Sequence, residues 1–151
     1  MGNAHPNLAP YAVFDCKDGW LILATGNDGQ YQRLCKILGL PDMATAPEFL
    51  TNADRVKNRA AMTDRITAAT KGWAKADLLA ACEAEGVPAG PINDMAEVFA
   101  DPQVVARGMQ IAPEGLPGVR SPMSFSGAEL SLDRPAPRLG QHQDEVLRAI
   151  G

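Results

Sequence analysis

Histidine and serine are the first residues in this sequence to consider as bases or nucleophiles, and their spacing forms no recognised catalytic set. The two histidines, His5 and His142, stand 137 positions apart, in or beside predicted loops. Either could serve as a base, although a lone surface histidine is usually inert. No serine stands in a Gly-x-Ser-x-Gly nucleophile elbow. We therefore expect no catalytic residue in this chain.

Two other patterns could bind ligands, and both favour a plain structural role. Residues 26–29, Gly-Asn-Asp-Gly, resemble a phosphate-cradling turn at the start of a helix. The turn lacks the Gly-x-Gly-x-x-Gly and Walker patterns, so a turn followed by a helix cap is the favoured interpretation. The three cysteines are Cys16, Cys35 and Cys82, and with two histidines and no Cys-x-x-Cys we expect no metal site.

Composition excludes several classes of function. The chain has 151 residues, a formal net charge of −4 and a pI of about 5.1, so we expect no nucleic-acid partner. No apolar run approaches the roughly 18 residues that span a bilayer, and residues 1–6 do not resemble a signal peptide. An odd number of widely spaced cysteines is typical of free, buried thiols in a reducing compartment. We expect a cytoplasmic globular domain, or part of a larger one, without membrane association.

The elements that would position these residues indicate an α/β protein of the α+β kind. Asp18-Gly19 between two apolar runs predicts an N-terminal β-hairpin with strands 11–16 and 20–24. Residues 40–50, with two prolines, predict an irregular connection. By default, Arg55, Lys57 and Arg59 are expected on a solvated helix face. Caps and apolar periodicity predict a helical middle at about residues 28–38, 52–72, 73–85, 94–99 and 102–107.

A stiff connector at residues 85–93 separates two of these helices. Two glycines and two prolines within it prevent either helix from continuing, and Val87 and Ile92 favour a short buried extended piece. Such a connector usually sets the angle between packing units.

The character of the chain changes after Gly108. Short strands are predicted at 109–112, 119–120 and 125–126, followed by an extended proline-rich segment at 133–139. A terminal helix at 141–150 carries Val146, Leu147 and Ile150, which we expect to be exposed unless they pack on another part of a larger protein. In the chain alone, we expect this tail to self-associate or to be disordered.

Six motifs, in order, resemble one family closely over essentially the whole chain. They are 2–7 (GNAHPN), 26–30 (GNDGQ), 51–59 (TNADRVKNR), 86–92 (GVPAGPI), 101–109 (DPQ…RGM) and 139–147 (LGQH…DEVL). In this order they resemble the C-terminal part of family III CoA-transferases. That group includes formyl-CoA, carnitine and bile-acid CoA-transferases and α-methylacyl-CoA racemase.

The resemblance implies an architecture. Members of the family are cytoplasmic homodimers with interlocked chains, each with a large CoA-binding domain, a small α/β domain and a segment that returns to the large domain. It implies a loop at residues 1–10, a small domain at 11–108, and a return linker with docking helix at 109–151.

The resemblance also implies the chemistry. Family transferases move CoA between an acyl-CoA and a carboxylic acid through an aspartate that becomes an acyl anhydride and then a thioester. That aspartate and most CoA-binding residues lie in the N-terminal domain, so the implied partner is that domain. Within this chain, Gly2, Asn3, Ala4 and His5 match a loop over the active site, with one glycine where formyl-CoA transferase has several. Pro88, Ala89 and Gly90 are expected near the substrate.

Two alternatives remain open. The chain could be a non-catalytic interaction or structural module derived from the family. It could also be part of an acyl-CoA racemase, which these residues do not separate from a transferase.

Overall fold

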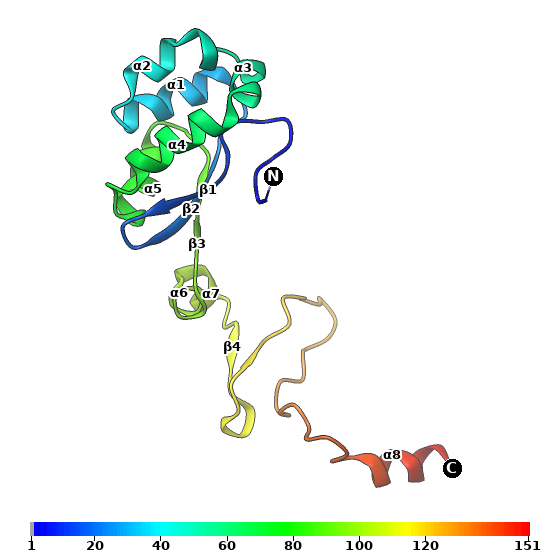
Figure 1. The fold of residues 1–151 in the computed structure, drawn as a ribbon. Helices are drawn as coiled ribbons and strands as arrows, with labels where there is room; N and C mark the ends of the chain where they lie inside the picture. The colour runs from blue at the N-terminus through cyan, green and yellow to red at the C-terminus, as the bar shows by residue number, and fades with distance from the viewer. Residues whose placement is uncertain (1) are drawn as a thin grey trace. The chain divides into compact units, whose positions relative to one another are not determined.

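The computed structural model describes residues 2–151 and divides the chain into two compact units (Figure 1). The first unit ends at Asn93 and the second begins at Asp94. The domain boundary predicted at residue 108 lies inside the second unit and stays a prediction. The mixture of an N-terminal hairpin, a helical middle, short strands and a terminal helix confirms the predicted fold class.

A three-stranded antiparallel sheet forms the base of the first unit. Its strands are β1 (Tyr11–Cys16), β2 (Gly19–Ala24) and β3 (Ala89–Ile92), in the order β1-β2-β3. The predicted hairpin is confirmed, with a two-residue loop because Cys16 pairs with Gly19. Gly19 has a φ of +143°, which an L side chain rarely adopts.

The connector at residues 85–93 supplies the third strand. Pro91 has no N–H to donate, and it is tolerated because β3 lies at an edge of the sheet. Val87 is buried, as predicted, but the expectation for Ile92 was wrong, since 39% of it is exposed. The connector is therefore part of the sheet itself.

Five α-helices and one 3₁₀ turn lie between the hairpin and β3 in the chain. They are α1 (Asp28–Ile37), α2 (Pro41–Thr45), η1 (Pro47–Phe49), α3 (Asn52–Lys57), α4 (Arg59–Thr70) and α5 (Lys75–Ala84). The predicted irregular connection at 40–50 was wrong, because each of its prolines starts a short helical turn at a position that needs no N–H donor. The single helix predicted at 52–72 is two helices, separated at Asn58, whose backbone is not helical (φ −102°, ψ 27°).

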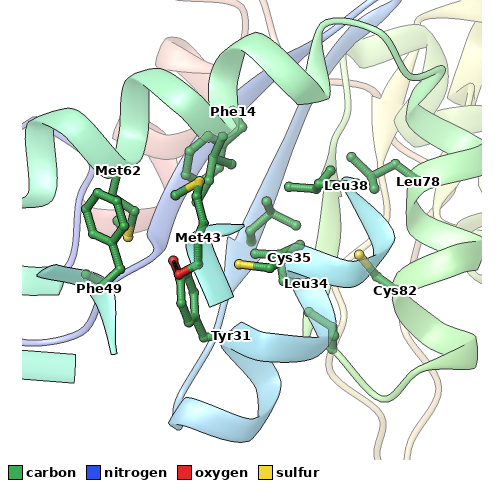
Figure 2. Packing of buried hydrophobic residues seen from close by; sticks show 14 of the residues in the cluster. Phe14, Tyr31, Leu34, Cys35, Leu38, Met43, Phe49, Met62, Leu78 and Cys82 are labelled. Carbon is green, nitrogen blue, oxygen red and sulfur yellow. Dashed lines mark hydrogen bonds between the residues drawn. The ribbon is translucent and has the colours of Figure 1, made fainter. Parts of the chain in front are cut away.

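The core lies between the helices and one face of the sheet. Figure 2 shows Phe14 from β1 with Tyr31 and Leu34 of α1, Met43 of α2 and Met62 of α4 among the buried side chains. Leu21 and Leu23 of β2 are fully buried. Cys35 and Cys82 are buried free thiols and Cys16 is half-buried, which confirms the prediction of free, largely buried cysteines.

Strand alternation places a second set of side chains on the other side of the sheet. We call this the open face, because its members face away from the core of the first unit. By the pairing register it consists of Tyr11, Val13, Asp15, Trp20, Ile22, Ala24, Gly90 and Ile92.

The second unit has shorter elements. They are α6 (Met95–Ala100), α7 (Pro102–Ala106), β4 (Gln110–Ile111), η2 (Pro113–Gly115), β5 (Gly118–Val119) and α8 (Gln143–Ile150), with β4 and β5 antiparallel. The strand predicted at 125–126 is absent from the described residues, and 133–139 has neither helix nor strand. In α8, Val146, Leu147 and Ile150 are exposed, as expected for a helix without a packing partner.

Candidate functional site

One end of the three-stranded sheet gathers the predicted site segments. Strands β1 and β3 both run antiparallel to β2, so both begin where β2 ends. There the Ala24 N–H donates to the carbonyl of Pro88 (2.9 Å), and the Thr25 N–H donates to that of Pro10 (3.0 Å). The N-terminal loop and the Pro88–Gly90 segment therefore flank the same end of the sheet. They lie at opposite edges, roughly 10 Å apart across β2.

The N-terminal loop is hydrogen-bonded along the outer edge of β1. The His5 N–H donates to the carbonyl of Tyr11 (2.9 Å), and the Val13 N–H donates to Oδ1 of Asn3 (3.1 Å). Ala4 is half-buried between them, and Gly2 is exposed with a φ of +57°. Because unpaired strand edges need partners, residues 3–5 act as a substitute for a fourth strand.

The orientation of the His5 imidazole is determined by three contacts. Its Nδ1 accepts hydrogen bonds from the N–H groups of Asn7 (3.1 Å) and Leu8 (3.0 Å). Its ring stacks on Tyr11 with a centroid separation of 5.1 Å and an interplanar angle of 13°. An Nδ1 that accepts two hydrogen bonds carries no proton, so the neutral ring carries its proton on Nε2. Within residues 2–151, Nε2 has no hydrogen-bond partner.

His5 can therefore donate one hydrogen bond to a carbonyl or carboxylate oxygen. His142, the other histidine, lies in the second unit, where its Nδ1 is 3.5 Å from Oε2 of Glu145. His5 is half-buried and held in place rather than freely exposed, and whether it is inert stays untested.

Polar side chains of α3 and α4 hold the rest of the loop. Asn52 Nδ2 donates to the carbonyl of Asn7 (2.8 Å), and its Oδ1 accepts from the Ala9 N–H (3.1 Å). Arg59 donates to the carbonyls of Pro6 (2.9 Å) and Leu8 (3.3 Å). The loop that carries His5 is thus bound to the helical layer as well as to the sheet.

Arg55 is a buried part of this support that the sequence interpretation missed. Only 1% of it is exposed, so placing it on a solvated face was wrong, and Arg59 is also engaged through the two loop carbonyls. Arg55 Nε donates to the carbonyl of Ala9 (2.7 Å), and Nη2 pairs with Oδ1 of Asp28 (2.7 Å). Further bonds from Nη1 reach the carbonyls of Phe49 and Leu50. The side chain therefore joins the N-terminal loop, η1 and the start of α1.

The Pro88–Gly90 segment contributes mainly backbone to the site. Pro88 is exposed, and Ala89 and Gly90 are half-buried. Gly90 pairs with Ile22, and a Cβ at Gly90 would lie 3.5 Å from Cγ2 of Ile22, an ordinary contact. Packing within the first unit therefore does not require a glycine at this position. Its missing side chain leaves space on the open face.

Two N–H groups at the turn of residues 26–29 are satisfied by side chains of the same segment. The Gln30 N–H donates to Oδ1 of Asn27 (2.9 Å), and the Gly26 N–H donates to Oε1 of Gln30 (2.7 Å). Asn27 is the N-cap of α1, which confirms the predicted turn and cap.

The described residues contain neither an activated thiol nor a cluster suited to a metal. Burial raises the pKa of Cys82 to about 11 and also raises that of Cys35, so both remain neutral thiols near pH 7. For Cys16, burial and the nearby Asp18 and Asp15 carboxylates raise the pKa. Within residues 2–151, no three His, Cys, Asp or Glu side chains gather closely enough to hold a metal ion. The same residues include no helix long and apolar enough to cross a membrane.

Comparison with known proteins places these features in a family. The sequence model of CoA-transferase family III matches residues 1–143. A succinate–glutarate CoA-transferase from Agrobacterium fabrum is 50% identical over 99% of this chain, and the human succinyl-CoA:glutarate CoA-transferase is 36% identical over the same share. The crystal structure of a CAIB/BAIF family protein from Brucella suis superposes on all of this chain with a TM-score of 0.88 and 50% identity.

These relatives are much longer than the chain. It spans 39% of the Agrobacterium protein, 35% of the human one and 40% of the Brucella structure. This chain belongs to CoA-transferase family III and corresponds to the C-terminal part of its longer members.

Proposed function

We propose that this chain is the C-terminal part of an enzyme that transfers CoA between an acyl-CoA and a carboxylic acid. The observation that carries the proposal is the 50% identity, over 99% of the chain, to a succinate–glutarate CoA-transferase. The substrate class we propose is a short dicarboxylic acid and its CoA thioester, because the named substrates of the Agrobacterium and human relatives are of this kind.

The proposed reaction uses a carboxylate nucleophile from a preceding N-terminal domain. An aspartate of that domain attacks the acyl-CoA carbonyl, forming a mixed anhydride and releasing the CoA thiolate. The thiolate then attacks the aspartyl carbonyl, giving an aspartyl-CoA thioester and the free donor acid. The acceptor acid runs the same two steps in reverse and leaves as its CoA thioester.

The part of this chain in the reaction is to complete the acyl site. Gly2, Asn3, Ala4 and His5 form one wall, and the segment with Pro88, Ala89 and Gly90 forms the other. The Nε2–H of His5 is a donor of fixed direction, suited to an oxygen of the acyl group or of its distal carboxylate.

The proposal includes the assembly of the whole protein. CoA would be bound mainly by the N-terminal domain, and two full chains would form an interlocked homodimer in the cytoplasm. The alternative of a non-catalytic module predicts stable association with that domain but no transfer.

The experiment reconstitutes the two parts. The chain is co-expressed with the portion of the Agrobacterium relative that precedes the match, and transfer of CoA from succinyl-CoA to glutarate is followed by mass spectrometry. We expect glutaryl-CoA from the purified pair and none from either part alone. A soluble, co-purifying pair that produces no glutaryl-CoA would contradict the transferase proposal and favour the non-catalytic module.

A further inference from the structure

We infer that the open face of the sheet is the surface on which the N-terminal region of the longer protein docks. The inference depends on the proposed function only in taking that region to be the partner. It assigns the contact to particular side chains in the first unit.

The open face is apolar across all three strands. Val13, Ile22 and Gly90 are cross-strand neighbours at its centre, and Trp20 lies directly opposite Ile92. Trp20 is 55% exposed and Ile92 is 39% exposed. Large apolar side chains that share one face without packing on the core are typical of a contact surface.

The one charge on this face is locally paired. Asp15 Oδ1 accepts a hydrogen bond from the Trp20 indole N–H (2.8 Å), and its Oδ2 is 3.6 Å from Nζ of Lys71. The carboxylate thereby orients the Trp20 ring at the end of the face. A partner can therefore cover the ring while the carboxylate keeps its hydrogen bond.

The path of the chain favours the N-terminal region as the occupant. The relatives extend well beyond the match, which covers only 39% of the Agrobacterium protein. Residues 3–5 are hydrogen-bonded along the β1 edge, and His5 stacks on Tyr11, a member of the open face. Any chain that precedes residue 2 therefore leaves from beside this face.

The size of the face argues against a second copy as its occupant. Strands of at most six residues, three abreast, give a surface of about 20 Å by 14 Å, on the order of 300 Å². Stable association between separate chains buries about 800 Å² on each partner. Under the proposed function the N-terminal region also meets the loop at residues 2–5, so the open face needs to supply only part of its contact area.

The test uses the same co-expressed pair with one charged substitution on the open face. Ile22→Glu places a carboxylate at the centre of the face, and Ala68→Glu places one at an exposed position of α4 as the matched control. We expect Ile22→Glu to reduce the N-terminal region recovered with the chain at least fivefold and Ala68→Glu to leave it unchanged. Circular dichroism of each variant chain alone verifies that both are folded.

A second readout follows the tryptophan directly. Acrylamide quenching of Trp20, obtained as the difference between the wild type and Trp20→Phe, should fall at least twofold in the pair relative to the chain alone. Unchanged quenching together with full recovery of Ile22→Glu would overturn the inference. A dimer of the isolated chain that Ile22→Glu dissociates would also overturn it, in favour of a second copy. Docking that Ile22→Glu disrupts and Ala68→Glu does not, without CoA transfer in the wild-type pair, would support this surface and contradict only the proposed function.

Discussion

The guanidinium carbon of Arg55 lies 4.3 Å from the centre of the Tyr31 ring, inside the core of the first unit. The Tyr31 hydroxyl in turn donates to the carbonyl of Met43 (3.1 Å). Burial raises the pKa of Tyr31, with Cys35 adding to the shift. A cation between an aromatic face, one carboxylate and several carbonyls is fully paired, which explains how an arginine is tolerated where only 1% of it is exposed.

The first prediction concerns that arginine. Arg55→Met keeps much of the side-chain volume but leaves buried carbonyls, including that of Ala9, without donors. We expect a loss of about 3 kcal/mol in the free energy of unfolding, measured by urea denaturation. Lys57→Met, at an exposed position of the same helix, should change it by less than about 0.5 kcal/mol. Equal effects of the two substitutions would contradict the assigned role.

The second prediction separates the two nitrogens of His5. In His5→Asn, the side-chain oxygen can replace Nδ1 as the acceptor for Asn7 and Leu8, but no donor remains at the position of Nε2. We expect thermal stability close to that of the wild type and a CoA-transfer rate in the reconstituted pair that is lower by at least about tenfold.

The His5 prediction has a direct spectroscopic check. Nitrogen-15 chemical shifts of the imidazole should show a neutral ring protonated at Nε2 at pH 8 in the isolated chain. A ring protonated at Nδ1, or a His5→Asn pair with an unchanged transfer rate, would refute the proposed donor.

The third prediction concerns Gly90. A Cβ there would make only an ordinary contact with Ile22, so Gly90→Ala should leave the stability of the isolated chain within about 1 kcal/mol of the wild type. If Gly90 faces the acyl group, the added methyl should raise KM for the acceptor acid several-fold in the pair. Gly127→Ala, where a Cβ would meet nothing within 4 Å, is the control for both measurements. An unchanged KM would remove this segment from the site.

The fourth prediction is a dependence of stability on alkaline pH. The pKa of Cys82 is raised from 9.0 to about 11 in the folded chain, because the neutral thiol is favoured by burial. Below pH 9 the Cys82 thiol is protonated in both the folded and the unfolded chain, so its contribution to stability is fully present. As the pH rises from 9 to 11, the unfolded chain loses the proton first, so the free energy of unfolding falls, by at most about 1.4 kcal/mol per pH unit from this group.

Comparison with Cys82→Ala isolates this thiol from Cys35 and Tyr31. The variant is expected to be less stable than the wild type at pH 8, because the substitution leaves a cavity. Between pH 9 and 11 its free energy of unfolding should fall by about 2 kcal/mol less than that of the wild type. Urea denaturation across this range measures both slopes. Parallel curves for the two proteins would show that Cys82 does not contribute.

Local signals in the sequence were enough to predict much of the fold. The hairpin depended on Asp18-Gly19, and the start of α3 on Thr51, whose side chain and that of Asp54 form a capping box. Such features involve neighbouring residues, so their physics is present in the sequence. Pro41 and Pro47 gave a misleading signal, since a proline that cannot continue a helix is well suited to start one.

The candidate site was only partly predictable. The loop and the connector were recognised as motifs, but a motif does not say which edge of the sheet its residues occupy. Arg55 was predicted on a solvated face, because a charged side chain is acceptable in a core only where partners exist. Those partners, among them Ala9 and Asp28, are 46 and 27 positions away.

The sequence by itself determined the family, the hairpin, the helix caps and the terminal helix, because each depends on local spacing or on motifs in order. Only the tertiary structure showed that the connector at residues 85–93 supplies the third strand of the sheet and that Pro88 and Pro10 meet the same end of β2. The physical reason is that strand pairing and the burial of a paired charge are long-range contacts. Their free energy depends on groups that the chain brings together only when it folds.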